Sequence, residues 1–246
     1  MTLSNLKATL RGGLLLGAAL SLFASSLLLA MDTVERNGVY LAPGWGKLSF
    51  EAPAAGTYEL PALEPASGGT LLDTAGENVE LDDLLGEKVS LLSFVYRTCD
   101  DINGCPLSTM VLYSVANRLA ETPELAKELR LLTISFDPEG DTPEAMAEYE
   151  ESILGDAELD WHFLTSASSA QIQPVLDAYQ QSVVQDPKSE DGKGKFSHIL
   201  RVYLIDQEQQ IRNIYNLSFL HPDILVNDIQ TILMENSDKG IARQQQ

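Results

Sequence analysis

The feature that most constrains the fold of this chain is an apolar run at residues 89–96 that leads directly into a loop carrying both of its cysteines. Such a run is typical of a strand that is covered on both faces of a sheet. The loop extends from Cys99 to Cys105, and Pro106 directly after it favours the first turn of a helix. The sequence therefore predicts a strand, a loop and a helix in succession. Two thiols then lie at the carboxyl end of a buried strand, where α/β folds place their chemistry.

The segments beyond this unit predict further strands and helices in a regular order. Residues 131–136 form a second buried strand, and Thr142 and Pro143 start a helix with a capping hydroxyl and a proline in the first turn. The other predicted elements are a hairpin at 70–76 and 78–81, a short strand at 161–164, a helix at 167–180 that contains Pro174, a hairpin at 199–205 and 211–215, and a closing helix at 223–234. We therefore expect an α/β fold of the thioredoxin-like class, a central mixed sheet with flanking helices.

The N-terminal stretch at residues 13–31 is apolar, with Lys7 and Arg11 before it and Asp32 after it. As a helix it spans about 28 Å, close to the thickness of the hydrocarbon layer of a membrane. The basic residues predict a single-pass transmembrane helix in a bacterial inner membrane, with the C-terminal domain in the periplasm. The alternative is a signal peptide whose cleavage releases the protein into the periplasm.

The remainder of the chain is expected to form one domain with a linker and a tail. The predicted parts are an anchor or signal at 1–31, a linker with short strands at 32–68, a thioredoxin-like domain at 69–236 and a polar tail at 237–246. The formal net charge is −20, from 16 Lys and Arg against 36 Asp and Glu. A surface this acidic argues against nucleic acid and anionic lipid as partners.

Cys99 and Cys105 could serve as a redox dithiol, as ligands of a metal or as a structural disulfide. Closing so short a loop with a disulfide contributes only about 2–2.5 kcal/mol, which is little for a chain long enough to build a core. A plain thiol-disulfide oxidoreductase places two residues between its cysteines, whereas Asp100, Asp101 and three more residues separate them here. The two aspartates should disfavour a thiolate at Cys99, and a bound cation would reverse that effect.

His198 is the third candidate residue, because it directly precedes the predicted strand at 199–205. Thioredoxin-like oxidoreductases commonly carry a cis-proline at this place, and the chain has none there. Two thiolates and one imidazole suit Cu(I), and with some expansion Cu(II). The polar, glycine-bearing stretch at 186–195 could act as a loop that brings His198 to the cysteines. The alternative is a histidine that starts a strand and binds the backbone.

Several segments, in their order along the chain, resemble the Sco/SenC family. They are Phe94-Val-Tyr-Arg-Thr-Cys99 with Cys105-Pro106, Phe136-Asp-Pro-Glu-Gly-Asp-Thr-Pro143, Trp161-His-Phe-Leu164, and Ser197-His198 with Tyr203-Leu-Ile-Asp206. The resemblance covers roughly residues 69–234. It implies a membrane-anchored, thioredoxin-fold copper protein of cytochrome c oxidase assembly.

By this resemblance, Cys99, Cys105 and His198 are the ligands of copper, and Asp137 lies near them. The family usually has three residues between its cysteines, and the longer loop here could shift the protein towards thiol chemistry. The sequence therefore leaves two functions open. The first is a metallochaperone that delivers copper to a respiratory oxidase copper-site subunit or to another copper chaperone. The second is a thiol-disulfide reductase that uses Cys99 and Cys105 as a redox pair. Both would need a thiol reductant as a further partner.

Overall fold

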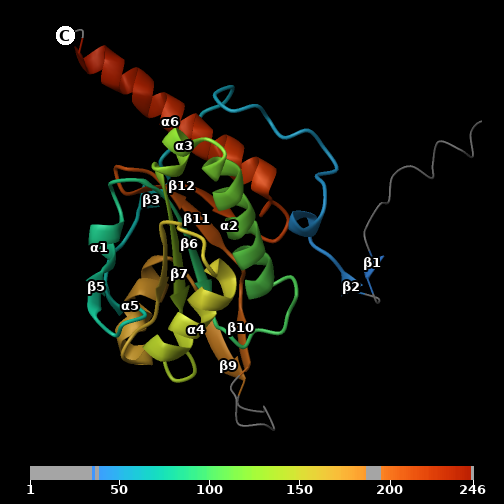
Figure 1. Ribbon diagram of the computed structural model, residues 1–246, viewed down its shortest axis with the longest axis vertical. Coiled ribbons are helices and arrows are strands. Elements are labelled where there is room, and N and C mark those ends of the chain that lie inside the picture. Colours follow the sequence, from blue (N-terminus) through green and yellow to red (C-terminus); the bar gives the residue numbers. More distant parts are fainter. Residues whose placement is uncertain (1–34, 37–38, 187–194, 245–246) are drawn as a thin grey trace, which may run out of the picture. The chain divides into compact units, whose positions relative to one another are not determined.

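The computed structural model describes residues 35–36, 39–186 and 195–244 (Figure 1). The chain divides into two units, residues 1–41 and residues 42–246. In the first unit β1 (Glu35–Arg36) pairs with β2 (Val39–Tyr40) as a short antiparallel ribbon. Among the described residues, no helix has the length and apolar character that crossing a membrane requires. The anchor predicted at 13–31 lies outside these residues.

A six-stranded mixed sheet forms the centre of the second unit, in the order β3-β12-β11-β6-β7-β8. Its strands are β3 (Glu64–Pro65), β6 (Val89–Val95), β7 (Leu129–Ser135), β8 (Trp161–Leu164), β11 (Val202–Ile205) and β12 (Gln210–Tyr215). β6, β7 and β8 run parallel, and β11 pairs antiparallel with β6. The strand before the cysteine loop therefore lies inside the sheet, as its apolar run predicted.

Helices flank this sheet. They are η1 (Pro43–Trp45, a single 3-10 turn), α1 (Leu81–Leu84), α2 (Cys105–Ala120), α3 (Pro123–Ala126), α4 (Pro143–Leu154), α5 (Ser169–Ala178) and α6 (Pro222–Gln244). The predicted start of α4 is confirmed, because the Thr142 hydroxyl accepts a hydrogen bond from the backbone N–H of Ala145. The hairpin predicted before residue 82 is also confirmed, as β4 (Thr70–Leu72) paired with β5 (Asn78–Glu80).

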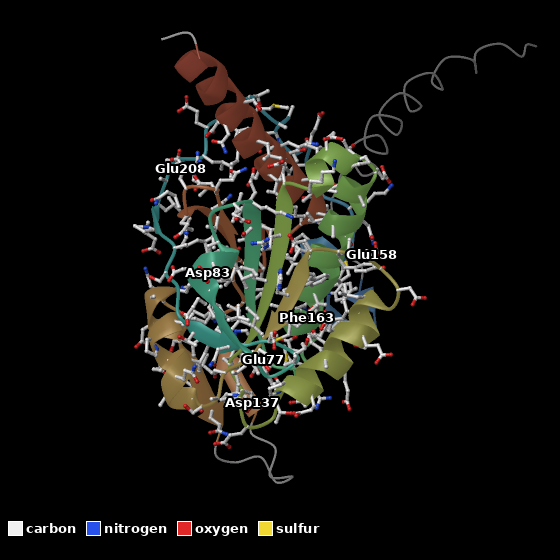
Figure 2. The ribbon with its side chains drawn as sticks, turned by 60° about the vertical axis from the view of Figure 1, so that its left-hand side comes forward. Glu77, Asp83, Asp137, Glu158, Phe163 and Glu208 are labelled. Carbon is white, nitrogen blue, oxygen red and sulfur yellow. The ribbon has the colours of Figure 1, made fainter. Side chains whose placement is uncertain are left out.

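Acidic side chains cover much of the surface. Figure 2 labels Glu77, Asp83, Glu158 and Glu208, all exposed and contributed by well-separated parts of the chain. These four acidic residues are therefore spread over the unit and not gathered in one segment.

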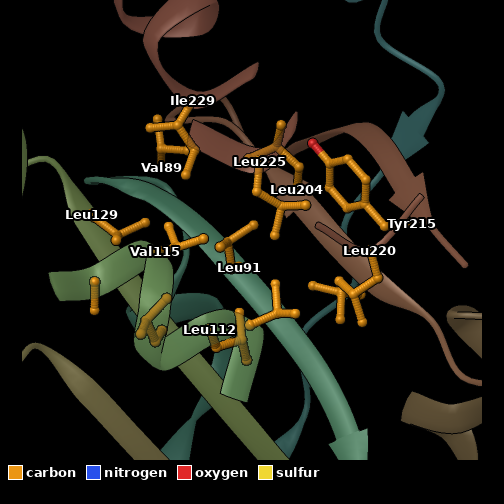
Figure 3. Packing of buried hydrophobic residues seen from close by; sticks show 14 of the residues in the cluster. Val89, Leu91, Leu112, Val115, Leu129, Leu204, Tyr215, Leu220, Leu225 and Ile229 are labelled. Atoms are coloured by element: carbon orange, nitrogen blue, oxygen red, sulfur yellow. The ribbon is translucent and has the colours of Figure 1, made fainter. Parts of the chain in front are cut away.

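Two hydrophobic clusters cover the two faces of the sheet. On one face Leu91 of β6 packs with Leu112 and Val115 of α2 and with Leu225 and Ile229 of α6 (Figure 3). The opposite face carries the cluster that contains Leu92 and Phe94 of β6 and the buried side of α5. Leu91 and Leu92 enter different clusters because successive side chains of a strand point to opposite faces. All seven residues of β6 are buried, so the strand is held rigidly up to the cysteine loop.

The residues before His198 differ from the prediction. β9 (Val183–Asp186) and β10 (Lys195–His198) pair antiparallel, with His198 opposite Val183. His198 therefore closes a strand of its own, and β11 begins only at Val202. The strands were missed because each is four residues long and the stretch between them is polar. Residues 187–194 of the predicted loop lie outside the described residues.

The predicted linker takes part in the folded unit, and the predicted tail is helical up to Gln244. Ala42, Leu60 and Ala66 are buried, and β3 pairs with β12 at the edge of the sheet. At the other end α6 continues to Gln244, ten residues beyond the predicted end of the closing helix at residue 234. The ion pair between Arg212 and Glu235, at 2.7 Å, supports this part of the helix. The sequence of α6 after Glu235 contains no proline that would break the helix.

Candidate metal centre

The two cysteines lie at the junction of β6 and α2. Cys105 is the first residue of α2 and is 2% exposed, whereas Cys99 in the loop is half-buried, and both thiols are free. The loop folds back on itself through hydrogen bonds from the Gly104 N–H to the Asp101 carbonyl (2.8 Å) and from the Asn103 N–H to the Asp101 carboxylate (3.0 Å). A Cβ on Gly104 would lie 3.2 Å from Cys99 Sγ, so the glycine lets this sulfur approach the start of the helix.

The two thiols have opposite acidities. The pKa of Cys99 falls to about 6, chiefly because the Cys105 thiol donates a hydrogen bond to the Cys99 thiolate. Backbone N–H groups of Cys105 and Asp101 and the Tyr96 hydroxyl add to this effect. The pKa of Cys105 is raised, because its proton is held by Cys99 and because the group is buried. The penalty expected for Cys99 from its acidic neighbours is therefore outweighed by hydrogen bonds to its thiolate.

His198 lies beside the buried cysteine, with 3.7 Å between His198 Nε2 and Cys105 Sγ. Its ring packs at 4.8 Å from the ring of Phe136 and at 6.4 Å from that of Tyr96. Burial lowers the pKa of His198, so the imidazole is neutral at pH 7 and retains a lone pair for a ligand. The amide of Gln181 contacts the other ring nitrogen, Nδ1, at 3.2 Å.

The distance between Cys105 Sγ and His198 Nε2 can be compared with the distance between two atoms that bind the same metal ion. With bonds of about 2.3 Å to sulfur and about 2.0 Å to nitrogen, at an angle of about 110–120°, the two ligand atoms lie about 3.5–3.7 Å apart. The 3.7 Å between Cys105 and His198 fits this value. Within the part of the chain that the structure describes, no set of three His, Cys, Asp or Glu side chains forms a ready-made metal cluster. Thiolates and an imidazole are donors that suit a soft metal.

The Asp-Pro loop after β7 carries two aspartates, Asp137 and Asp141. Asp137, labelled in Figure 2, accepts a hydrogen bond from the Gly140 N–H (3.1 Å) in its own turn, and burial raises the pKa of its carboxyl. Asp141 is 1% exposed, and its carboxylate accepts from the Arg97 N–H (2.9 Å) and the Ser135 hydroxyl (2.6 Å). Asp141 therefore ties this loop to the segment that leads to Cys99. Asp141 could have been found from the sequence, because it is the second aspartate of the segment 136–143.

The segment at residues 42–46 supports the cysteine loop, which the sequence did not indicate. The Ala42 N–H donates to the Asn103 side-chain oxygen (2.8 Å), and the Trp45 ring N–H donates to the Ile102 carbonyl (3.2 Å). Gly44 lies between them against the start of α2. The longer loop between the cysteines is thus braced from outside by a remote part of the chain.

Replacing Gly44 with alanine is expected to lower the free energy of unfolding by about 1–3 kcal/mol, because overpacking forces the surroundings to shift. The added Cβ would lie 2.4 Å from the carbonyl oxygen of Leu220, a backbone atom that has little room to move. Urea denaturation measures the change. Gly46→Ala is the matched control, since nothing lies within 4 Å of a Cβ there. Equal midpoints for the two variants would contradict this packing.

Two clefts open beside Cys99. The first, of about 440 Å³, is lined by Cys99, Asp101 and His198 among other residues, and the second, of about 330 Å³, by Cys99, Cys105 and Met110 among others. Cys99 borders both clefts, whereas His198 borders the first and Cys105 the second.

The other two histidines have structural partners. His162 contacts the Asp160 carboxylate through Nε2 at 2.9 Å. His221 accepts a hydrogen bond from the Asp223 N–H at the start of α6 (3.1 Å), and its Nε2 lies 3.1 Å from the Gly46 carbonyl oxygen. His221 is thus a residue of the cap region of α6.

Comparisons with known proteins agree with this arrangement. Residues 67–234 match a family model described as SCO1/SenC. The chain is 27% identical over 164 residues to "SCO1 protein homolog" of Bacillus subtilis, covering 66% of this chain and 79% of that protein. It is 31% identical over 149 residues to "Protein SCO2 homolog, mitochondrial" of Danio rerio, covering 59% of this chain and about half (49%) of that protein.

A solved structure extends the likeness to the fold. The structure of ScoI from Bradyrhizobium japonicum, described as having copper bound, aligns with a TM-score of 0.57 and 26% sequence identity. The alignment covers 68% of this chain and 99% of that one. The predicted thioredoxin-like α/β fold with a central mixed sheet is thereby confirmed.

Proposed function

The chain belongs to the SCO1/SenC family, and on this premise we propose that it is a copper-binding assembly factor of cytochrome c oxidase. In this role Cys99, Cys105 and His198 hold one copper ion, as Cu(I) or Cu(II), and pass it to the copper-site subunit of a respiratory oxidase or to another copper chaperone. The observation that carries the proposal is the 3.7 Å contact between Cys105 Sγ and His198 Nε2, beside a second free thiol.

Each residue contributes a distinct property to this task. Cys99 has the lowered thiol pKa, so it offers a thiolate near neutral pH. Cys105 gives up its proton to solvent when the metal binds, because only the thiolate is a ligand. His198 is already neutral, so its imidazole does not have to lose a positive charge before it binds the metal. The rings of Tyr96 and Phe136 beside it limit the access of water. Copper itself is the cargo, a soft ion that thiolates and imidazole prefer over hard cations.

The direct test is a titration of the reduced protein with Cu(I) in competition with a copper chelator. We expect one equivalent of copper per chain, and no tight binding after Cys99 and Cys105 have been oxidised to a disulfide. Both sulfurs must be thiolates to act as ligands, so oxidation removes them. A reduced protein that leaves all copper on the chelator would contradict the proposal.

A thiol-disulfide reductase is the second candidate, and the opposite acidities of the two thiols favour it. The Cys99 thiolate would attack a disulfide of the partner protein and form a mixed disulfide. The Cys105 thiol would then lose its proton and displace the partner as a dithiol, which leaves Cys99 and Cys105 joined in a disulfide. A thiol reductant would restore the pair. This reaction does not require His198, so the His198→Ala variant separates the two candidates.

We further place the protein in a bacterial inner membrane, held by residues 13–31, with the remainder in the periplasm. The support is the apolar stretch with basic residues on its N-terminal side only. The alternative is release into the periplasm after cleavage of a signal peptide. Recovery of the full-length chain in the membrane fraction is expected, and a soluble form that starts after residue 26 or 30 would count against the anchor.

A further inference from the structure

Two hydrogen bonds fasten the middle of the cysteine loop to a remote part of the chain. The Ile102 carbonyl accepts one from the Trp45 ring N–H (3.2 Å), and the Asn103 side-chain oxygen accepts the other from the Ala42 N–H (2.8 Å). Both acceptors lie between the two cysteines, whereas the donors lie 57 and 61 positions earlier in the sequence. We call this pair of bonds the loop clamp.

The donor side of the loop clamp is itself held by two helices. Gly44 is buried, and a Cβ on it would lie 3.0 Å from the Leu107 side chain in the first turn of α2. The Gly46 carbonyl oxygen lies 3.1 Å from Nε2 of His221, at the start of α6. The segment at residues 42–46 is therefore tied to α2 and α6 and can serve as a fixed support for the loop.

The bonds inside the loop shape it but do not place it against the rest of the fold. The Gly104 N–H and the Asn103 N–H both donate to Asp101, which closes a turn within the loop. Cys105 is already fixed as the first residue of α2, whereas Cys99 lies in the loop and is half-buried. The loop clamp joins this turn to the remainder of the unit, and so it bears on where the Cys99 sulfur stands relative to Cys105.

We propose that Ala42 and Trp45 are positioning residues of the metal site, which keep the cysteine loop in the conformation that binds copper. An ion that binds a mobile loop must order it, and this ordering costs conformational entropy that a loop already held in place does not lose. The inference rests on the proposed function for the identity of the ion, whereas the order of the loop is a property of the metal-free protein.

The proposal places part of the site outside the segment that matches the family model. That match begins at residue 67, and both positioning residues precede it. A site assembled from the matched segment alone would contain the two cysteines and His198 without the support of their loop.

Two substitutions remove the loop clamp with little other change. Trp45→Phe deletes the ring N–H and keeps an aromatic ring against the hydrophobic cluster. Ala42→Pro deletes the backbone N–H, and the φ of −62° at this residue is one that proline adopts. Ala42→Ser keeps the N–H and is the control for the second change. Trp161→Phe is the matched control for the first, because the ring N–H of this other tryptophan donates to Thr133 inside the sheet (2.9 Å).

The experiment is hydrogen exchange of the reduced, metal-free chain, followed by mass spectrometry of peptides that span residues 99–105. One hydrogen bond is worth a factor of about 2–10 in an equilibrium constant, so we expect about tenfold faster exchange in the Ala42→Pro/Trp45→Phe double variant. Ala42→Ser and Trp161→Phe should exchange at the rate of the parent in this loop. Peptides from β6 serve as the internal reference, since a general loss of stability would accelerate exchange there as well.

Copper affinity is then measured on the same proteins, by titration with Cu(I) against a chelator. The double variant should bind about tenfold more weakly than the parent, and the two control variants should bind as the parent does. A role in stability alone would lower the urea midpoint and leave both the loop exchange and the copper affinity unchanged.

Three results would overturn the inference. They are unchanged loop exchange in the double variant, an equal acceleration in Trp161→Phe, and faster loop exchange with unchanged copper affinity. If the double variant does not fold, Trp45→Phe alone decides, with about threefold changes expected in both measurements. If the parent itself binds no copper, the proposed function fails, and the exchange rates still show whether the loop clamp orders the loop.

Discussion

Replacing His198 with alanine weakens Cu(I) binding by more than about 100-fold, because a metal ligand is lost and even changes to residues that support a ligating histidine alter affinity by about 10–100-fold. The imidazole nitrogen at 3.7 Å from Cys105 Sγ leaves the site, and no methyl group can replace its lone pair. Competition titration of the reduced protein against a copper chelator measures the loss.

His162→Ala is the matched control for this substitution. His162 contacts Asp160, apart from the cysteines, so copper affinity should stay within the error of the titration. His221→Ala should behave likewise in binding, although the loss of its bond to the Asp223 N–H lowers stability. If His198→Ala binds copper as tightly as the parent and still exchanges disulfides with a partner, the reductase function replaces the chaperone function.

Replacing Cys105 with alanine should slow the alkylation of Cys99 at pH 6 by about tenfold. The Cys105 thiol is the main cause of the lowered pKa of Cys99, which is about 6. Without it the pKa returns towards about 8.5, and the thiolate fraction at pH 6 falls by about 100-fold. A more basic thiolate is intrinsically more reactive, which recovers about one factor of ten. The rate of alkylation between pH 5 and pH 9, followed by mass spectrometry, shows both effects.

Cys105→Ser is the control for this prediction, since a serine hydroxyl also donates a hydrogen bond. Its alkylation profile should keep a midpoint closer to 6 than that of the alanine variant. The hydrogen bond stabilises the Cys99 thiolate, so it lowers the pKa and the thiolate persists to a lower pH. Equal profiles for the serine and alanine variants would show that burial and backbone groups, and not the neighbouring side chain, control Cys99.

The parts of the fold that could be predicted are those set by local pattern. The apolar run of β6 gave a fully buried strand, and Pro106 in the first turn gave the start of α2. Thr142 gave the cap of α4 through its hydroxyl. In each case the physical cause lies within a few residues of its effect, so the sequence alone expresses it. The cysteines and His198 were identified by residue type and by resemblance.

The parts that could not be predicted depend on contacts between remote segments. The Ala42 N–H donates a hydrogen bond to Asn103, 61 positions away, and no local sequence pattern predicts that bond. Asp137 was predicted to lie near the site and Asp141 was not, although either aspartate fits a turn. Only the fold shows that the Asp141 carboxylate accepts a hydrogen bond from the Arg97 N–H, whereas Asp137 accepts one from Gly140. The contact of Gln181 with His198 Nδ1, at 3.2 Å, likewise joins two segments that no local pattern connects.

The position of Cys99 on the border of both clefts makes one sulfur atom common to two entrances. If that sulfur binds a metal, it is a weaker nucleophile than the free thiolate, because part of its charge is donated to the ion. A sulfur in a mixed disulfide, in turn, is no ligand for a metal. In a protein with both of the proposed functions, metal binding and thiol exchange would therefore compete for the same sulfur atom.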